Sequence, residues 1–192
     1  MKEEVEDEPY LISRCRAGDA DAFYKLVKPF MNRVYSAAYA ILRSPHLAED
    51  AVQNAMLEAY RSIMNGKQIR SFGPWFKKVA AMRAMDLARE RSRRLKKTGE
   101  MKQGELADQR QQPLDAVVKK EAEEQLLQQV LSLNKRHRCV IVLYYYHEMT
   151  VEEIAEILGV KAGTVKSRLY HARMKLLKLN QNTDSKQVIF NV

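Results

Sequence analysis

The sequence has few of the residues from which covalent or metal-centred sites are built. Its 192 residues include only two cysteines and four histidines. Cys15 and Cys139 lie in apolar helical contexts without CxxC spacing, so we expect reduced, buried thiols rather than a disulfide. No two histidines have a metal-binding spacing such as HExxH, and no phosphate-binding loop or Ser/His/Asp set occurs. We therefore predict no metal, no cofactor and no catalytic residue, as for a protein that is not an enzyme.

A long hydrophobic run is also missing. The longest unbroken apolar stretch, residues 139–146, is far shorter than the roughly 20 residues that a membrane-spanning helix requires. The N-terminal sequence MKEEVEDEP lacks the basic, apolar and small-residue pattern of a signal peptide. We therefore expect a cytoplasmic protein with no direct membrane insertion.

Signals for β-strands are scarce, and the chain has only seven glycines. Long segments instead repeat apolar residues at helical spacing, which predicts an all-α protein. The run from Val140 to Tyr146 has the propensity of a strand. Because no second strand is predicted nearby to pair with it, we interpret this run as a buried helix.

A polar, aromatic-free segment containing Gly99, Gly104 and Pro113 separates two helical regions and is typical of a flexible linker. We predict two small helical domains, the second containing a helix-turn-helix. The expected division is an acidic tail at 1–9, a first domain at 10–97, the linker at 98–117, a second domain at 118–179 and a C-terminal tail at 180–192.

Carboxylates are absent from one long stretch near the C-terminus. The net charge is +9, although the first eight residues hold five acids and one lysine. No Asp or Glu occurs between Glu156 and Asp184, and basic residues also gather in the run 89–97. Such clustered positive charge indicates a polyanionic partner, although a basic run can also be an ordinary solvated helix face.

The carboxylate-free stretch begins within a predicted helix-turn-helix. Thr150 and Glu153 form a capping-box pattern that starts one helix, and Gly159 ends it. Four apolar residues should share its buried side: Val151, Ile154, Ala155 and Leu158. A second helix follows from Gly163, with apolar residues at i, i+4, i+7 and i+11: Val165, Leu169, Ala172 and Leu176.

The missing carboxylates have a physical reason if this second helix binds DNA. A helix in the major groove lies between two rows of phosphates, which repel Asp and Glu and attract Lys and Arg. An amphipathic helical hairpin with a basic face is the alternative interpretation of the same pattern.

These residues resemble a known family. TVEEIAEILGVKAGTVKSRLYHARMKL, residues 150–176, resembles the C-terminal DNA-binding domain of the extracytoplasmic-function (ECF, group IV) sigma factors of the sigma-70 family. LAEDAVQNAMLEAY, residues 47–60, resembles the segment by which the family docks on core RNA polymerase. SFGPWFKKVAAMRAMDLARERSRR, residues 71–94, resembles the segment that opens the promoter. The resemblance covers residues 10–95 and 118–178.

The resemblance implies three sets of functional residues. The set expected to bind core polymerase is Asp50, Gln53, Asn54, Met56 and Leu57, most of which share one helix face by their spacing. The set expected at the minus-10 element is Lys67, Arg70, Ser71, Phe72, Trp75, Lys78, Arg89 and Arg93. The set expected at the minus-35 element is Gly163, Thr164, Lys166, Ser167, Arg168, His171 and Arg173.

Aromatic rings interleaved with basic residues are suited to holding unpaired bases. We expect Phe72 and the loop NGKQIRS, residues 65–71, to be free to meet DNA. Trp75, Phe76 and Val79 have core spacing, so we expect most of their surface to be buried. The resemblance implies that the loop captures an extruded base of the minus-10 element.

Three residues depart from the family pattern. Met82 stands where Asn is usual, Asn134 where Pro is common, and Lys161 where a helix-capping residue is frequent. None lies among the residues expected to bind core polymerase or on the buried side of the helix that begins at Gly163. The departures therefore make the promoter sequence uncertain without changing the expected function.

The expected function is that of a sigma factor, which binds bacterial core RNA polymerase and directs promoter-specific initiation of transcription. The resemblance further implies stress or envelope-response genes, and control by an anti-sigma factor, which can be membrane-anchored in this family. One alternative is a stand-alone helix-turn-helix regulator. The other is an adaptor that binds polyanions or membranes without reading sequence.

Overall fold

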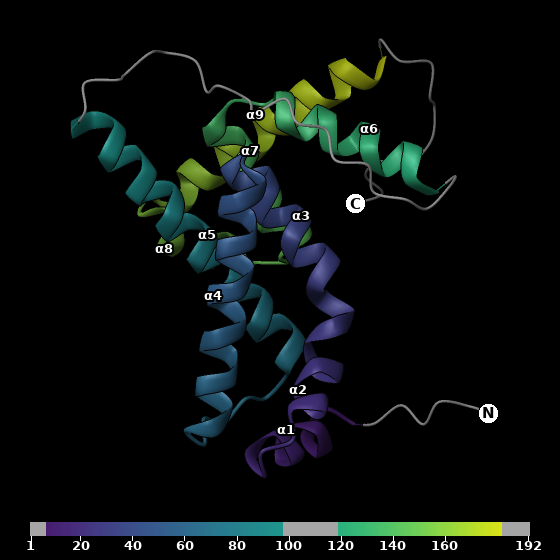
Figure 1. Ribbon diagram of the computed structural model, residues 1–192. Coiled ribbons are helices and arrows are strands. Elements are labelled where there is room, and N and C mark those ends of the chain that lie inside the picture. Colours follow the sequence, from purple (N-terminus) through teal and green to yellow (C-terminus); the bar gives the residue numbers. More distant parts are fainter. Residues whose placement is uncertain (1–6, 98–118, 182–192) are drawn as a thin grey trace. The chain divides into compact units, whose positions relative to one another are not determined.

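The computed structural model describes residues 7–97 and 119–181 (Figure 1). All the secondary structure in these residues is helical, so the predicted all-α class is confirmed. The described chain divides into two compact units. Unit 1 comprises residues 7–97 with 146–148, and unit 2 comprises residues 119–145 with 149–181.

Unit 1 contains five α-helices: α1 (Glu8–Arg16), α2 (Ala20–Val27), α3 (Met31–Leu42), α4 (Pro45–Met64) and α5 (Phe72–Lys97). Asp19 and Ser44 cap α2 and α4 by accepting hydrogen bonds from the amides of Ala22 and Leu47. Such caps satisfy amide groups that have no partner inside the helix. Pro45 stands in the first turn of α4, where its missing amide costs no hydrogen bond.

Pro29 interrupts what the sequence pattern suggests is one helix. A single 3-10 turn, η1 (Lys28–Phe30), separates α2 from α3. Proline lacks the amide that an α-helix would use and its ring collides with the preceding turn, so the chain changes direction there. This break lets α3 pack beside α4 and α5 instead of continuing the line of α2.

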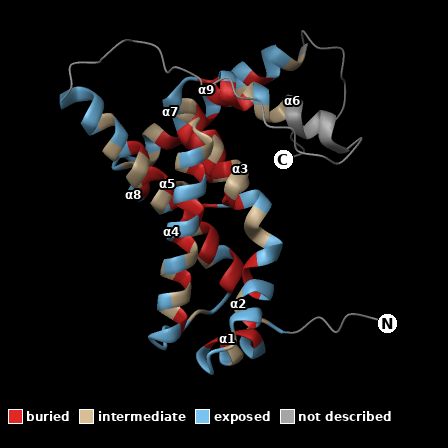
Figure 2. Cartoon of the chain, viewed as in Figure 1, coloured by how far each residue is buried: buried red, intermediate tan, exposed pale blue. Residues whose placement is uncertain are grey.

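The core of unit 1 is built largely from alanine, which brings α3, α4 and α5 close together (Figure 2). Each of the three helices buries several: Ala37, Ala38 and Ala40 on α3, Ala48, Ala51, Ala55 and Ala59 on α4, and Ala80, Ala81, Ala84 and Ala88 on α5. Larger side chains, including Val34, Ile63 and Phe76, fill the space between them. Full burial stabilises each of these by about 1.5–3 kcal/mol.

Unit 2 contains α6 (Lys119–Ser132), α7 (Lys135–Ile141), α8 (Val151–Leu158) and α9 (Ala162–Gln181). A π-helical turn, η2 (Val142–Tyr146), follows α7 directly. The run with strand propensity is therefore helical, as predicted. Val140, Val142 and Leu143 are fully buried in it, so tertiary packing overrides the local preference.

Arg138 lies at the centre of unit 2 and is completely buried. Its guanidinium donates hydrogen bonds to the carbonyl oxygens of Leu133, at 2.7 Å, and Leu131, at 3.5 Å. These carbonyls stand at the end of α6, where a helix has unpaired acceptors and a negative dipole end. Arg138 therefore joins α7 to the C-terminus of α6.

The buried faces of α8 and α9 match the predicted pattern in most positions. Val165, Leu169, Ala172 and Leu176 are all buried on α9. On α8, Ile154 and Ala155 are buried as predicted, but Val151 and Leu158 are only half-buried. Ile157 is buried instead, and α8 packs on α9. No helix among the described residues has the length and apolar character of a membrane span.

Candidate nucleic-acid interface

The predicted polymerase-docking strip lies on the outward face of α4. Asp50, Gln53, Asn54 and Leu57 are exposed, while the alanines on the other side of α4 are buried. Leu57 is 53% exposed and is the large apolar residue within the strip. Met56 is only half-buried and lies beside the strip. The strip is therefore a polar surface with one exposed apolar centre.

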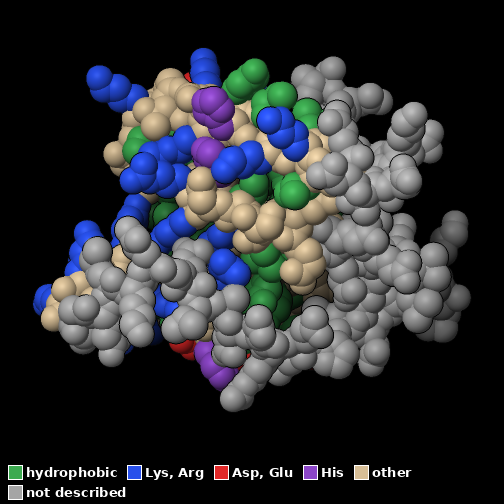
Figure 3. All heavy atoms as spheres, turned by 90° about the horizontal axis from the view of Figure 1, so that it is seen from above, with side chains coloured by type: hydrophobic (Ala, Val, Ile, Leu, Met, Phe, Trp, Pro, Cys, Tyr) green, Lys and Arg blue, Asp and Glu red, His purple; other side chains and the backbone are tan. Residues whose placement is uncertain are grey.

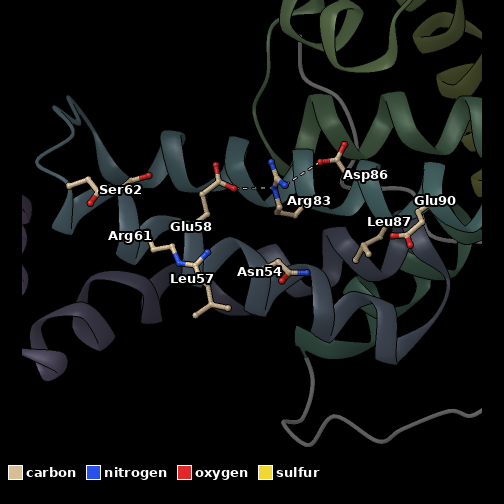
Figure 4. Close-up of a pocket in the computed structure, with 10 residues that line it drawn as sticks. Asn54, Leu57, Glu58, Arg61, Ser62, Arg83, Asp86, Leu87 and Glu90 are labelled. Atoms are coloured by element: carbon tan, nitrogen blue, oxygen red, sulfur yellow. Dashed lines mark ion pairs between the residues drawn. The ribbon is translucent and has the colours of Figure 1, made fainter.

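An open cleft of about 460 Å³ runs along the strip between α4 and α5 (Figure 4). Arg83 bridges the two helices, with its Nε 3.0 Å from the Glu58 carboxylate and Nη1 3.4 Å from that of Asp86. The cleft is lined by Asn54, Leu57, Glu58, Arg61, Ser62, Asn65, Arg83, Asp86, Leu87 and Glu90. Its lining combines charges of both signs with a little apolar surface, so the cleft, like the strip, is mainly polar.

The predicted minus-10 residues begin in the loop that joins α4 to α5. Lys67, Arg70 and Ser71 are exposed there. Gly66 has φ = 75°, a left-handed conformation that glycine adopts without strain and that ends α4. The loop therefore presents two cations and a hydroxyl to solvent.

The expectation that Phe72 is free to meet DNA is wrong, because its ring is completely buried. The ring stacks on Phe76, with 5.4 Å between centroids, and contacts Phe30 and Trp75. A Cβ on Gly73 would lie 2.6 Å from the Phe30 ring, so glycine is needed for α5 to start this close to Phe30. Phe72 anchors α5 in the core.

Trp75 is the aromatic residue that stays accessible next to the loop. It is half-buried, whereas Phe76 and Val79 are buried as predicted. The Lys67 ammonium lies 5.2 Å from the centre of the Trp75 ring, within the range of a cation–π interaction. Cation and ring together form the kind of surface on which an unpaired base can stack.

The remaining predicted minus-10 residues lie along α5. Lys78 is half-buried, and Arg89 and Arg93 are exposed. Arg89 also forms an ion pair with Asp86, 3.1 Å apart. Arg91, in the same basic run, donates a hydrogen bond to the Leu42 carbonyl at the end of α3 and so has a structural role. The basic residues of this run are therefore exposed, and Arg91 also ties α5 to the end of α3.

The helix-turn-helix of unit 2 has the predicted local geometry. The capping box is present: the Glu153 amide donates to Thr150 Oγ1 at 3.2 Å, and the Thr150 amide donates to the Glu153 carboxylate at 3.0 Å. Gly159 ends α8 with φ = 64°. The amides of Thr164 and Val165 donate to the carbonyl oxygen of Lys161.

The predicted minus-35 residues occupy the N-terminal half of α9. Gly163, Lys166, Ser167 and His171 are exposed, and Thr164, Arg168 and Arg173 are half-buried. No carboxylate occurs on α9, so the exposed side of this helix is suited to phosphate contact. In the view of Figure 3, which includes side chains of both units, many Lys and Arg and very few Asp or Glu are visible among the described residues.

Arg173 has structural partners that the sequence pattern did not indicate. Its Nε donates a 2.9 Å hydrogen bond to the Tyr145 hydroxyl, and its guanidinium lies over the rings of Tyr144 and Tyr145, 5.4 and 5.6 Å from their centroids. These contacts orient the arginine. Tyr144 and Tyr145 lie almost thirty residues before Arg173, too far apart for a helical or strand pattern to link them, so no sequence signal indicates this contact.

His137 of α7 packs against the face of α9 that carries His171. Its ring stacks on that of His171, with 6.3 Å between centroids. Its buried Nδ1 has no hydrogen-bond partner among the described residues. Burial, and then the nearby charges of Lys175, His171 and Arg168, lower the pKa of His137 below its ordinary value of 6.5. The imidazole therefore favours its neutral form.

Two further expectations concern cysteine and histidine. Cys15 and Cys139 are both buried, as predicted. Burial raises the pKa of the Cys15 thiol, which keeps it protonated. Among the described residues, no three His, Cys, Asp or Glu side chains come together in a group that could hold a metal ion.

Comparison with known proteins places both units in one family. Residues 26–94 match the family model described as Sigma-70 region 2, and residues 123–176 match Sigma-70, region 4. The ECF RNA polymerase sigma factor SigW of Bacillus subtilis is 33% identical over 174 residues, which are 87% of this chain and 93% of SigW. The ECF RNA polymerase sigma-E factor of Escherichia coli is 26% identical over 180 residues, covering 90% of this chain and 93% of that protein.

Solved structures have the same fold. The sigma factor RpoE of Bartonella quintana, in complex with the anti-sigma factor NepR, aligns with a TM-score of 0.59 at 20% identity and covers 86% of this chain and 100% of RpoE. CnrH, in complex with the cytosolic domain of CnrY, aligns with a TM-score of 0.53 at 22% identity over 91% of this chain and 97% of CnrH. Both family models match this chain, region 2 before region 4, and the chain is 33% identical to SigW over 93% of the length of SigW. The chain therefore belongs to the ECF sigma factors of RNA polymerase.

Proposed function

We propose that unit 1 docks on core RNA polymerase through the exposed strip of α4 and opens the minus-10 element with the loop 65–71 and α5, while α9 reads the minus-35 element. The domain boundaries expected from the sequence, 10–97 and 118–179, are part of this proposal. As an ECF sigma factor, the chain directs promoter-specific initiation of transcription. The polymerase supplies the covalent chemistry, and the chain works where the polymerase works, in the cytoplasm.

The observation that carries the docking proposal is the exposure of Leu57 within a polar strip. A buried alanine face fixes α4 in unit 1, so the strip is held outward on a rigid helix. A single large apolar side chain surrounded by Asp50, Gln53 and Asn54 has the composition of a small contact centre with a polar rim.

An anti-sigma factor is the further partner that we propose. RpoE of Bartonella quintana was solved in complex with the anti-sigma factor NepR. On this precedent, a partner that covers the strip of α4 or the basic face of α9 would keep this chain from polymerase or promoter. We propose that the promoters that this chain recognises belong to stress or envelope-response genes, and this part of the proposal is based on the family relationship.

The docking proposal is tested by measuring the affinity of the fluorescently labelled chain for bacterial core RNA polymerase. Leu57→Ala and Asp50→Ala should each weaken binding by about tenfold, the effect of losing about 1.4 kcal/mol at a contact centre. Glu49→Ala is the matched control, because Glu49 is an exposed acid next to Asp50 but outside the strip. Equal affinity of the Leu57→Ala variant and the unsubstituted chain would contradict the proposal.

A further inference from the structure

Side chains from α1 hold both ends of the loop 65–71, although α1 is about fifty residues away in sequence. Arg16 Nε donates a hydrogen bond to the carbonyl oxygen of Ile63, at 3.2 Å, and its Nη2 donates to that of Lys67, at 3.1 Å. At the other end, the Glu8 carboxylate accepts a 2.9 Å hydrogen bond from the amide of Phe72. The three bonds connect the two ends of one helix to the two ends of one loop.

The Arg16 contacts fix how the chain leaves α4. Ile63 lies in the last turn of α4, where the helix dipole favours a cation, and its carbonyl accepts from the Gly66 amide as well as from Arg16. Lys67 lies beyond the helix, in the loop. The planar guanidinium holds both carbonyls in one geometry, which a lysine ammonium could not do with the same rigidity.

The Glu8 contact fixes how the chain enters α5. Phe72 is the first residue of α5, so its amide is one of the donors that a helix leaves unpaired. A carboxylate at this place also interacts favourably with the positive end of the helix dipole. Glu8 therefore caps α5 from another helix, a role that no local sequence pattern could indicate.

The helix that supplies both side chains is itself anchored. Leu11, Ile12 and Cys15 of α1 are buried in unit 1, and α1 packs on α2 and α4. Arg14 forms an ion pair with Asp19, the residue that caps α2. The clamp, that is, the hydrogen bonds of Glu8 and Arg16 to the two ends of the loop, is therefore formed by a fixed helix. It holds the backbone from which Lys67, Arg70 and the half-buried Trp75 project.

We propose that Glu8 and Arg16 are positioning residues for promoter opening, which hold the loop 65–71 in the conformation that receives the unpaired minus-10 strand. This inference rests on the proposed role of the loop. A loop that is ordered before DNA arrives does not have to lose conformational freedom on binding, and preorganisation of this kind raises affinity. Releasing either end should therefore weaken capture of the single strand and leave polymerase docking unchanged, because neither residue lies in the strip of α4.

The experiment uses the full chain assembled with core polymerase. The probe is a fluorescent single-stranded oligonucleotide carrying the non-template minus-10 sequence of a promoter mapped with the unsubstituted protein. Glu8→Ala and Arg16→Ala should each bind the probe about tenfold more weakly, while their affinity for core polymerase stays unchanged. Glu8→Gln should bind the probe more tightly than Glu8→Ala, because its amide oxygen can still accept from the Phe72 amide. Ser13→Ala is the control on the same helix, because Ser13 is exposed and its hydroxyl donates within α1, to the Tyr10 carbonyl.

Each outcome decides the inference. Unchanged probe affinity in both alanine variants would overturn it while leaving the proposed function intact. Equal losses of probe affinity and core affinity would show that α1 is needed only for folding of unit 1, and would overturn the positioning role. An unsubstituted chain that binds core polymerase but not the probe would contradict the role proposed for the loop itself.

Discussion

At the scale of single residues, His137 is an ionisable group held in an unfavourable place for its charged form. Its ring is half-buried between α7 and α9, and Lys175, Arg168 and His171 of α9 lie near it. Burial is the largest cause of its lowered pKa, and the two basic side chains act in the same direction. Protonation of His137 therefore costs free energy in the folded protein.

This predicts that unit 2 loses stability on acidification. Because the folded pKa lies below the unfolded value of about 6.5, the unfolded chain binds more protons between the two values. The His137 contribution is complete above pH 6.5 and falls as the pH drops below it, by at most about 1.4 kcal/mol per pH unit. Urea unfolding followed by circular dichroism at pH 7.5 and 5.5 measures the change.

His137→Gln is the control for this prediction, since its side chain does not titrate. The stability difference between the two pH values should be smaller in this variant than in the unsubstituted chain. If both proteins lost the same amount of stability on acidification, His137 would not be the group responsible.

Side-chain orientation at residues such as Phe72 could not be predicted from the sequence. Its place at the start of a helix, among basic residues, is compatible with either a DNA contact or a core anchor. The ring points inward because Gly73 lets Phe30 approach, and this depends on a residue over forty positions away. Arg173 is a similar case, since its tyrosine partners lie on η2.

At the scale of elements, local patterns predicted the helices well wherever the signal was a cap or a buried stripe. The capping box of α8, the left-handed Gly159 and the buried stripe of α9 are all confirmed. Such features depend on residues within a few positions of one another. The clamp of α1 on the loop 65–71 depends on contacts between residues far apart in the sequence, so no local pattern predicts it.

The capping box supports a prediction about the helix-turn-helix. Thr150→Ala should lower the free energy of unfolding of unit 2 by about 1 kcal/mol, because the Glu153 amide loses its acceptor. Thr150→Ser keeps the hydroxyl and should change stability little. Thermal unfolding followed by circular dichroism distinguishes the two. An alanine variant as stable as the serine variant would indicate that packing, not the cap, fixes the start of α8.

At the scale of the whole molecule, the charge pattern and two motifs in a fixed order along the sequence indicate a DNA-binding partner of RNA polymerase. The family matches at residues 26–94 and 123–176 confirm the family. The fold adds the burial of the predicted minus-10 residues: most of the cations are exposed, Lys78 and Trp75 are half-buried, and Phe72 is in the core.

We propose that docking by α4 and promoter reading by α9 are both required for initiation. Run-off transcription with purified core polymerase on a pool of promoter fragments tests both roles in one experiment. We expect discrete transcripts with the unsubstituted chain and with Glu49→Ala, and their loss with Asp50→Ala and with Arg168→Ala. Specific DNA binding without any transcript, or full transcription by either Asp50→Ala or Arg168→Ala, would show that the proposal is wrong.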